Sequence, residues 1–85
     1  MKYTIVYKQS ASKELLQLPA KIAYKTRAAI NSLSENPRPH GCKKLHGSDN
    51  EYRIRIGNYR VIYIISDGVL IITVIKIAHR KDVYR

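Results

Sequence analysis

The chain has 85 residues, of which 16 are Lys or Arg and six are Asp or Glu, so its formal net charge is +10. This length allows one small domain, expected over residues 1–85, and the 45% of hydrophobic residues can form a core. The lone Cys42 excludes an intrachain disulfide, and no apolar stretch suits a signal peptide or a membrane span. We therefore expect a small, basic, cytoplasmic protein.

The positive charge is spread along the chain. Residues 1–42 carry seven basic and two acidic side chains, and residues 43–85 carry nine and four. Basicity of a whole domain is typical of proteins that bind nucleic acid or nucleoprotein. A solubilising surface charge or an acidic protein partner would also account for it.

The first half of the chain predicts one strand and two helices. Residues 2–7 are rich in Tyr, Thr, Ile and Val, which favours a strand. Ser10 and Ser12 are candidate N-caps for a helix that ends before Pro19. Over residues 20–35 apolar side chains recur at helical spacing, which indicates an amphipathic helix with one buried stripe and one basic face.

The second half predicts a run of strands, because the apolar period changes to two after two prolines. Strands are expected over residues 51–56, 59–65 and 69–77, and a short edge strand over 43–45. Gly57-Asn58 and Asp67-Gly68 are typical two-residue hairpin turns. The order β-α-α-β-β-β predicts an α+β fold in which two N-terminal helices pack on one face of an antiparallel sheet.

The first hairpin is expected to gather three arginines. With a two-residue turn, Arg55 lies opposite Arg60, and alternation along the strand puts Arg53 on the same face. Like charges placed directly opposite each other are destabilising, and the planar fork of arginine suits phosphate. A solvated strand face is the alternative, but such a face usually mixes both signs of charge. We therefore expect a phosphate site there.

Three segments of the chain resemble a known family. Residues 52–61 (Tyr-Arg-Ile-Arg-Ile-Gly-Asn-Tyr-Arg-Val) are similar to the central hairpin of the RelE/ParE superfamily of bacterial and archaeal toxins, and residues 79–84 (His-Arg-Lys-Asp-Val-Tyr) resemble its C-terminal block. Pro37 followed by Lys-Lys-Leu-His-Gly at 43–47 resembles a third family segment. The resemblance covers essentially the whole chain and favours the RelE-like branch.

The resemblance implies the toxin of a type II toxin-antitoxin system, neutralised by a cognate antitoxin. The implied activity is a ribosome-dependent endoribonuclease that inhibits translation by cleaving mRNA in the ribosomal A site, with no metal or other cofactor. The implied catalytic residues are Arg53, Arg55, Arg60, Arg80 and Tyr84. The residues expected to bind RNA are Lys43, Lys44, Arg53, Arg55 and Lys81. Two departures from the family are the arginines at 53 and 55, where RelE has lysines, and a shorter interval from Arg80 to Tyr84.

Metal-free RNA cleavage by the 2′-hydroxyl needs charge stabilisation at the phosphate and two proton transfers. Arginines suit the first task because they stay protonated. Arg60 and Arg80 are expected to be exposed cations at the scissile phosphate. Histidine changes charge near neutrality, so His79 is a further catalytic candidate, with a purely structural role as the alternative. Tyr84 is expected either to stack on a base or to transfer a proton.

Other functions remain open at this point. The same fold supports a ParE-like inhibitor of DNA gyrase, or a basic RNA-binding module without catalysis. His40, Cys42 and His46 lack the paired spacing of a zinc site, so no metal is expected. If the second hairpin turn also has two residues, apolar side chains join the arginines on one face, with Ile75 opposite Arg60, and such a surface suits an antitoxin segment that folds on binding. These apolar residues are Ile62, Ile64, Ile71 and Ile75.

Overall fold

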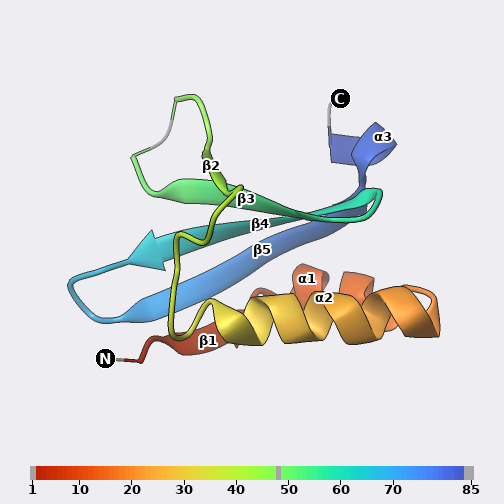
Figure 1. The fold of residues 1–85 in the computed structure, drawn as a ribbon, viewed down its shortest axis with the longest axis horizontal. Helices are drawn as coiled ribbons and strands as arrows, with labels where there is room; N and C mark the ends of the chain where they lie inside the picture. Colours follow the sequence, from red (N-terminus) through yellow and green to blue (C-terminus); the bar gives the residue numbers. More distant parts are fainter. Residues whose placement is uncertain (1, 48, 84–85) are drawn as a thin grey trace.

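The computed structural model describes residues 2–47 and 49–83 (Figure 1). Two helices, α1 and α2, lie against one face of a five-stranded sheet, and the short helix α3 lies on the opposite side. The predicted α+β fold is therefore confirmed. Its elements are β1 (Thr4–Tyr7), α1 (Gln9–Leu16), α2 (Ala20–Ser32), β2 (Lys43–Lys44), β3 (Glu51–Ile56), β4 (Tyr59–Ser66), β5 (Ile71–His79) and α3 (Arg80–Val83).

The sheet is mixed rather than purely antiparallel. Its strand order is β1-β5-β4-β3-β2, and β1 runs parallel to β5, with Thr4 beside Ile71 and Tyr7 beside Val74. The remaining pairs are antiparallel. A parallel pair needs a long connection between its strands, and here both helices and three strands intervene. Because β1 and β5 lie far apart in the sequence, no local sequence pattern predicts that they pair.

The β3–β4 hairpin has the predicted register. Ile56 pairs with Tyr59 and Arg55 with Arg60, so Gly57 and Asn58 form the two-residue turn. Gly57 has a φ of +59°, in the left-handed region that glycine adopts without a steric penalty. The register of the first hairpin therefore follows directly from its turn.

The β4–β5 connection differs from the prediction. Four residues, 67–70, join the strands, and Leu70 takes a φ of +56°. A bulge between Ile62 and Tyr63 then shifts the register once more and leaves Ile75 as the extra residue. Arg60 consequently lies beside Ala78, so the prediction that Ile75 opposes Arg60 is wrong.

α1 begins and ends earlier than predicted, whereas α2 begins as predicted and ends earlier. Lys8 donates its N–H to the Val74 carbonyl at the end of β1, and its own carbonyl accepts the N–H of Ser12 at 3.0 Å. The chain thus passes from strand to helix without a loop, and α1 starts at Gln9, before the expected caps. α2 begins directly after Pro19 and ends at Ser32.

The core lies between the helices and the inner face of the sheet. In a chain without Phe or Trp, Tyr63 is the largest fully buried side chain. Its hydroxyl donates to the Pro37 carbonyl at 2.8 Å, and burial raises the pKa of Tyr63 because the phenolate would lose its hydration. The buried cluster comprises Ala11, Leu15, Ile30, Leu33, Ile54, Val61, Tyr63, Ile65, Ile72, Val74 and Ile77.

Over residues 2–47 and 49–83, no helix has the length and apolar character to cross a membrane.

A polar network links the loop after α2 to the sheet. Arg38 donates from Nη2 to Asp67 Oδ2 at 2.9 Å and from Nε to the Tyr52 hydroxyl at 3.2 Å. The Tyr3 hydroxyl donates to Asp67 Oδ1 at 2.6 Å. The bonds from Arg38 and Tyr3 lower the pKa of Asp67, and the bond to Asp67 raises the pKa of Tyr3. The network therefore ties the β4–β5 turn to the residue that precedes β1.

We expect Asp67→Asn to weaken the acid sensitivity of the fold. A carboxyl with a lowered folded-state pKa contributes stability that is complete above its unfolded pKa of about 4 and is lost as the pH falls through the folded value. The free energy of unfolding, measured with urea, should therefore differ less between about pH 7 and about pH 3 for Asp67→Asn than for the wild type. The exposed Asp49 supplies the control, since Asp49→Asn should keep the wild-type difference. An unchanged difference in Asp67→Asn would contradict the role of the network.

Candidate functional site

Strands β3 and β4 direct three arginines away from the helices. Ile54 and Val61 belong to the core on the inner face, so alternation sends Arg53, Arg55 and Arg60 to the outer face, here called the arginine face. Arg55 and Arg60 are direct cross-strand partners, as predicted. At such positions the Cβ atoms lie about 5 Å apart, so two positive charges share one patch of surface.

The register extends this patch into two adjoining rows. The first row, across β3, β4 and β5, is Arg55, Arg60 and Ala78. The second, across β2 to β5, is Lys43, Arg53, Ile62 and Lys76. Lys44 instead pairs with Tyr52, which points it to the other side of the sheet. The outer face therefore brings Lys43 to the arginines but leaves Lys44 apart from them.

Two of the arginines on the outer face are largely buried. Arg53 is 7% exposed and Arg60 5%, whereas Arg55 is exposed. The expectation of an exposed cation therefore fails for Arg60. Long arginine stems cover apolar surface, and Ile62 on the same face is correspondingly 9% exposed. Packing restricts these side chains, which favours fixed, preorganised hydrogen-bond donors over mobile ones.

Arg55 occupies a different setting at the edge of the sheet. The short strand β2 pairs only with Tyr52 and Arg53, so β3 is an edge strand beside Arg55. A cavity of about 340 Å³ opens there between α2 and the loop before β2, and Arg55, His40 and Ile54 contribute to its lining. This cavity therefore lies directly beside the exposed guanidinium group of Arg55.

Glu51 is an acidic residue that the sequence reasoning overlooked. It lies two positions before Arg53 on β3 and therefore on the same face, opposite Ile64. Among the strand residues that the structure describes, it is the one carboxylate that the register places on the arginine face. The alternation Glu51, Arg53, Arg55 in the sequence carries this signal. A carboxylate here can balance the charge of Arg53 or accept a proton.

Helix α3 brings two further cations to the outer side of the sheet (Figure 1). It packs against β4 and β5, and the N–H of Arg80 donates to the Asn58 carbonyl at 2.8 Å. The side chains of Arg80 and Lys81 are exposed. Arg80 is therefore anchored by its backbone beside the β3–β4 turn. Tyr84 lies outside the described residues.

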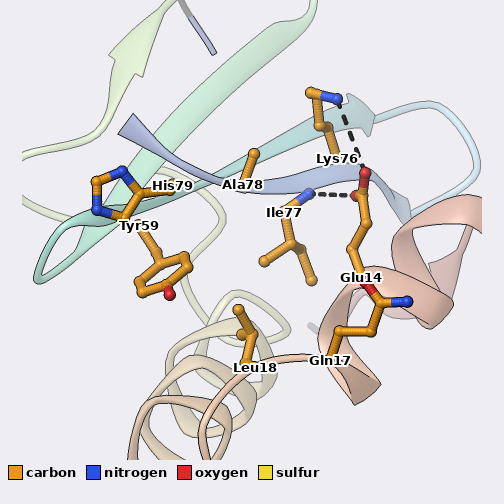
Figure 2. A pocket seen from close by; sticks show the side chains of 8 residues that line it. All are labelled: Glu14, Gln17, Leu18, Tyr59, Lys76, Ile77, Ala78 and His79. Carbon is orange, nitrogen blue, oxygen red and sulfur yellow. Dashed lines mark hydrogen bonds and ion pairs between the residues drawn. The ribbon is translucent and has the colours of Figure 1, made fainter. Parts of the chain in front are cut away.

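His79 points away from this cluster. It pairs with Tyr59 on the side of the sheet that faces the helices, and their two rings meet edge to face at 5.3 Å between centroids. Its Nδ1 accepts the N–H of Lys81 at 3.3 Å. Figure 2 shows His79 lining a pocket with Leu18 and Glu14. The structure therefore separates His79 from Arg60 by the thickness of the sheet.

No metal centre is evident in the described part of the chain. Over residues 2–47 and 49–83, no three His, Cys, Asp or Glu side chains come close enough to hold a metal ion. Cys42 is half-buried and its thiol is free of any disulfide. Besides guanidinium, ammonium and carboxylate groups, the register places the hydroxyl of Thr73 on the outer face, opposite Ile64.

Comparison with known proteins decides the family. Residues 5–84 match the model described as "ParE toxin of type II toxin-antitoxin system, parDE". The chain belongs to the RelE/ParE family of toxins. It is 35% identical over 88 residues to "Putative toxin RelE1" of Methanocaldococcus jannaschii, across 100% of this chain and 98% of the relative. It is 30% identical over 86 residues to "Toxin RelG" of Mycobacterium tuberculosis, across 100% and 99%.

Solved structures agree with this assignment. The archaeal RelE–RelB complex from Pyrococcus horikoshii OT3 contains a chain that superposes with a TM-score of 0.84 at 28% identity, covering 94% of this chain and 97% of that one. The RelBE2 toxin-antitoxin complex of Mycobacterium tuberculosis gives a TM-score of 0.80 at 27% identity, covering 94% and 100%. The predicted RelE-like toxin is therefore confirmed. For this member of the RelE/ParE family, the roles of individual arginines stay predictions.

Proposed function

We propose that this RelE-like toxin is a ribosome-dependent endoribonuclease that cleaves mRNA in the A site and acts in the cytoplasm. The observation that carries the proposal is the cationic patch on the outer side of the sheet. Arg55 and Arg60 are direct partners there, and Lys43 and Arg53 stand in the next row. Guanidinium groups bind phosphate with fixed geometry, so a patch of this density suits an RNA backbone.

The proposed reaction uses the RNA itself as nucleophile. The 2′-hydroxyl attacks the adjacent phosphorus, the bond from phosphorus to the 5′-oxygen breaks, and the products are a 2′,3′-cyclic phosphate and a 5′-hydroxyl. No metal or cofactor takes part. The arginines stabilise the charge that grows on the phosphoryl oxygens, and the buried setting of Arg53 and Arg60 limits their reorganisation. Lys43 and Lys81 hold the flanking RNA, whereas Lys44 pairs with Tyr52 and points to the other side of the sheet, so it lies outside this surface.

Proton transfer is the second requirement of this reaction. The proton of the 2′-hydroxyl needs an acceptor, and the leaving 5′-oxygen needs a donor. Tyr84 is proposed for this work on the strength of the family tail motif. Glu51 shares the arginine face and is a second candidate acceptor. His79 is on the opposite side of the sheet, which favours a structural role for it.

The proposed protein partner is a cognate antitoxin. Toxins of similar structure from Pyrococcus horikoshii and Mycobacterium tuberculosis form RelE–RelB and RelBE2 complexes. In this chain, Ile62, Ile64 and Ile71 lie on the arginine face beside the cations. A mixed apolar and cationic surface suits an acidic segment that becomes ordered on binding.

Inhibition of DNA gyrase is the second candidate function, and the matched family model favours it because the model is that of ParE toxins. One experiment separates the two. The toxin is added to a reconstituted translation reaction with mapping of mRNA ends, and in parallel to a gyrase supercoiling assay. Cuts at A-site codons with normal supercoiling are expected. Intact mRNA with blocked supercoiling would replace the proposal with the gyrase function.

A further inference from the structure

Strand β5 is longer than the strand beside it. β1 pairs with β5 only as far as Val74, because the chain then leaves the sheet to form α1, whereas β5 continues to His79. On its other side β5 stays paired with β4 up to His79. Within residues 2–47 and 49–83, no strand pairs with the β1 side of β5 beyond Val74. This side is called the β5 edge below.

The hydrogen bonds around this segment show which backbone groups face the edge. The Arg80 N–H donates towards β4, to the Asn58 carbonyl, whereas the Ile77 N–H donates away from β4, to Oε1 of Glu14 at 2.8 Å. Backbone groups of alternate residues in a strand point to opposite sides. The amide and carbonyl groups of Ile77 and His79 therefore face the β5 edge. These are the groups with which an added strand forms hydrogen bonds.

Glu14 occupies the edge in the way a partner would. Its Oε1 accepts the Ile77 N–H, and its Oε2 lies 3.7 Å from Nζ of Lys76 (Figure 2). One carboxylate thus fills a position for a backbone carbonyl and at the same time meets an ammonium group. An extended chain with an acidic side chain reproduces both contacts, its carbonyl on Ile77 and its carboxylate on Lys76.

A pocket beside the edge gives room for such a chain. It measures about 360 Å³, and Glu14 and Lys76 lie at one end of it while the rings of Tyr59 and His79 lie at the other (Figure 2). Leu18 forms an apolar wall between them. A side chain from an added strand that points towards the helices enters this pocket.

We propose that the β5 edge, from Ile77 to His79, accepts an extended acidic segment of the antitoxin as an added strand, which displaces Glu14 from the Ile77 amide. The identity of the partner rests on the proposed function. A second copy of the chain is a poor occupant, because each copy carries a net charge of +10 and the ammonium group of Lys76 lies beside Glu14 at the edge. Addition of a strand to an exposed edge is a common mode of peptide recognition.

Hydrogen exchange tests the position of the added strand. The full-length toxin is compared alone and in complex with the antitoxin encoded beside its gene. The His79 amide should exchange at least about tenfold more slowly in the complex, because a new hydrogen bond to the antitoxin protects it from exchange. Protection that appears instead on the amides of β2, at the other sheet edge, would overturn the proposal, and so would an unchanged His79 amide.

A matched pair of variants tests the acidic character of the segment. Lys76→Gln should weaken antitoxin binding about five- to tenfold at low salt, while Lys25→Gln, on the exposed face of α2, should change it less than about twofold. Both variants lose one positive charge, so the general attraction is matched. Equal effects would overturn the proposed contact with Lys76. Protection of His79 in the complex, together with no mRNA cleavage by the free toxin, would contradict the nuclease alone, whereas failure to form any complex would overturn this inference.

Discussion

Replacement of Arg60 or Arg80 by Ala is expected to slow mRNA cleavage on programmed ribosomes by about 10²–10³-fold each. Both cations are proposed to meet charge that develops on the phosphate in the transition state. Their loss should therefore lower the single-turnover rate far more than the affinity for ribosomes. The measurement pairs cleavage rates at saturating toxin with ribosome binding of the same variants.

Controls separate this effect from damage to the fold. Arg60 is 5% exposed, so its removal can also lower stability, and thermal unfolding of each variant must accompany the rates. Arg60→Lys keeps the charge and stem but loses the planar fork, and an intermediate rate is expected. Arg27→Ala removes an exposed arginine from α2 in the other layer and should leave cleavage within about twofold of the wild type. Wild-type rates for Arg60→Ala and Arg80→Ala would show that the proposed site is wrong.

The same assay distinguishes the groups that handle protons. Tyr84→Phe keeps the aromatic ring and loses only the hydroxyl, so it should retain activity if Tyr84 stacks on a base, and lose activity if the hydroxyl transfers a proton. Tyr84→Ala should be severely impaired in both cases. His79→Ala should keep most of its activity, since His79 faces the helices. Loss of cleavage in His79→Ala alone would transfer the proton role to His79.

Free mRNA is expected to be cleaved about 10³-fold more slowly than the same mRNA held in the ribosomal A site. The arginine face is the surface of a sheet, and in-line attack requires the 2′-hydroxyl, the phosphorus and the leaving oxygen to be aligned. Alignment of reacting groups contributes several kcal/mol, and about 1.4 kcal/mol corresponds to a tenfold change in rate. Under the proposed function, the ribosome supplies this alignment by holding the mRNA.

The test compares one labelled mRNA at one toxin concentration with and without ribosomes. The Arg60→Ala variant serves as the control for contaminating nucleases, because cleavage of free RNA that persists in this variant does not come from the site. Equal, Arg60-dependent rates in both conditions would contradict the need for the ribosome. The nuclease would then be complete by itself.

The β3–β4 hairpin could be predicted in detail from the sequence, because its turn carries a local code. Gly57-Asn58 selects a two-residue turn, and the turn alone fixes the partnership of Arg55 with Arg60. The β4–β5 hairpin could not be predicted in this way. Asp67-Gly68 is also a typical two-residue turn sequence, yet the connection has four residues. Leu70 adopts a left-handed conformation, which its residue type does not predict. The bulge at Ile62 and Tyr63 carries no sequence signal that we can identify.

The burial of Arg53 and Arg60 could not be predicted from the alternation of residues along their strands. Alternation placed Arg53 and Arg60 on the outer face correctly, but it treats every outward residue as exposed. Their small exposed fractions depend on neighbours distant in the sequence, which include the paired strands and helix α3 against β4 and β5. The opposite orientation of His79 follows from its pairing with Tyr59, which the shifted β4–β5 register determines.

The parallel pairing of Thr4 with Ile71 has a consequence for synthesis of the chain. Translation produces β1 first, but its neighbour β5 leaves the exit tunnel only after every other strand. Until then, the nascent chain lacks Ile72, Val74 and Ile77, which complete the core against α1 and α2. Pairing between distant segments also slows folding. The toxin thus reaches its finished form only once the ribosome that made it has released most of its length.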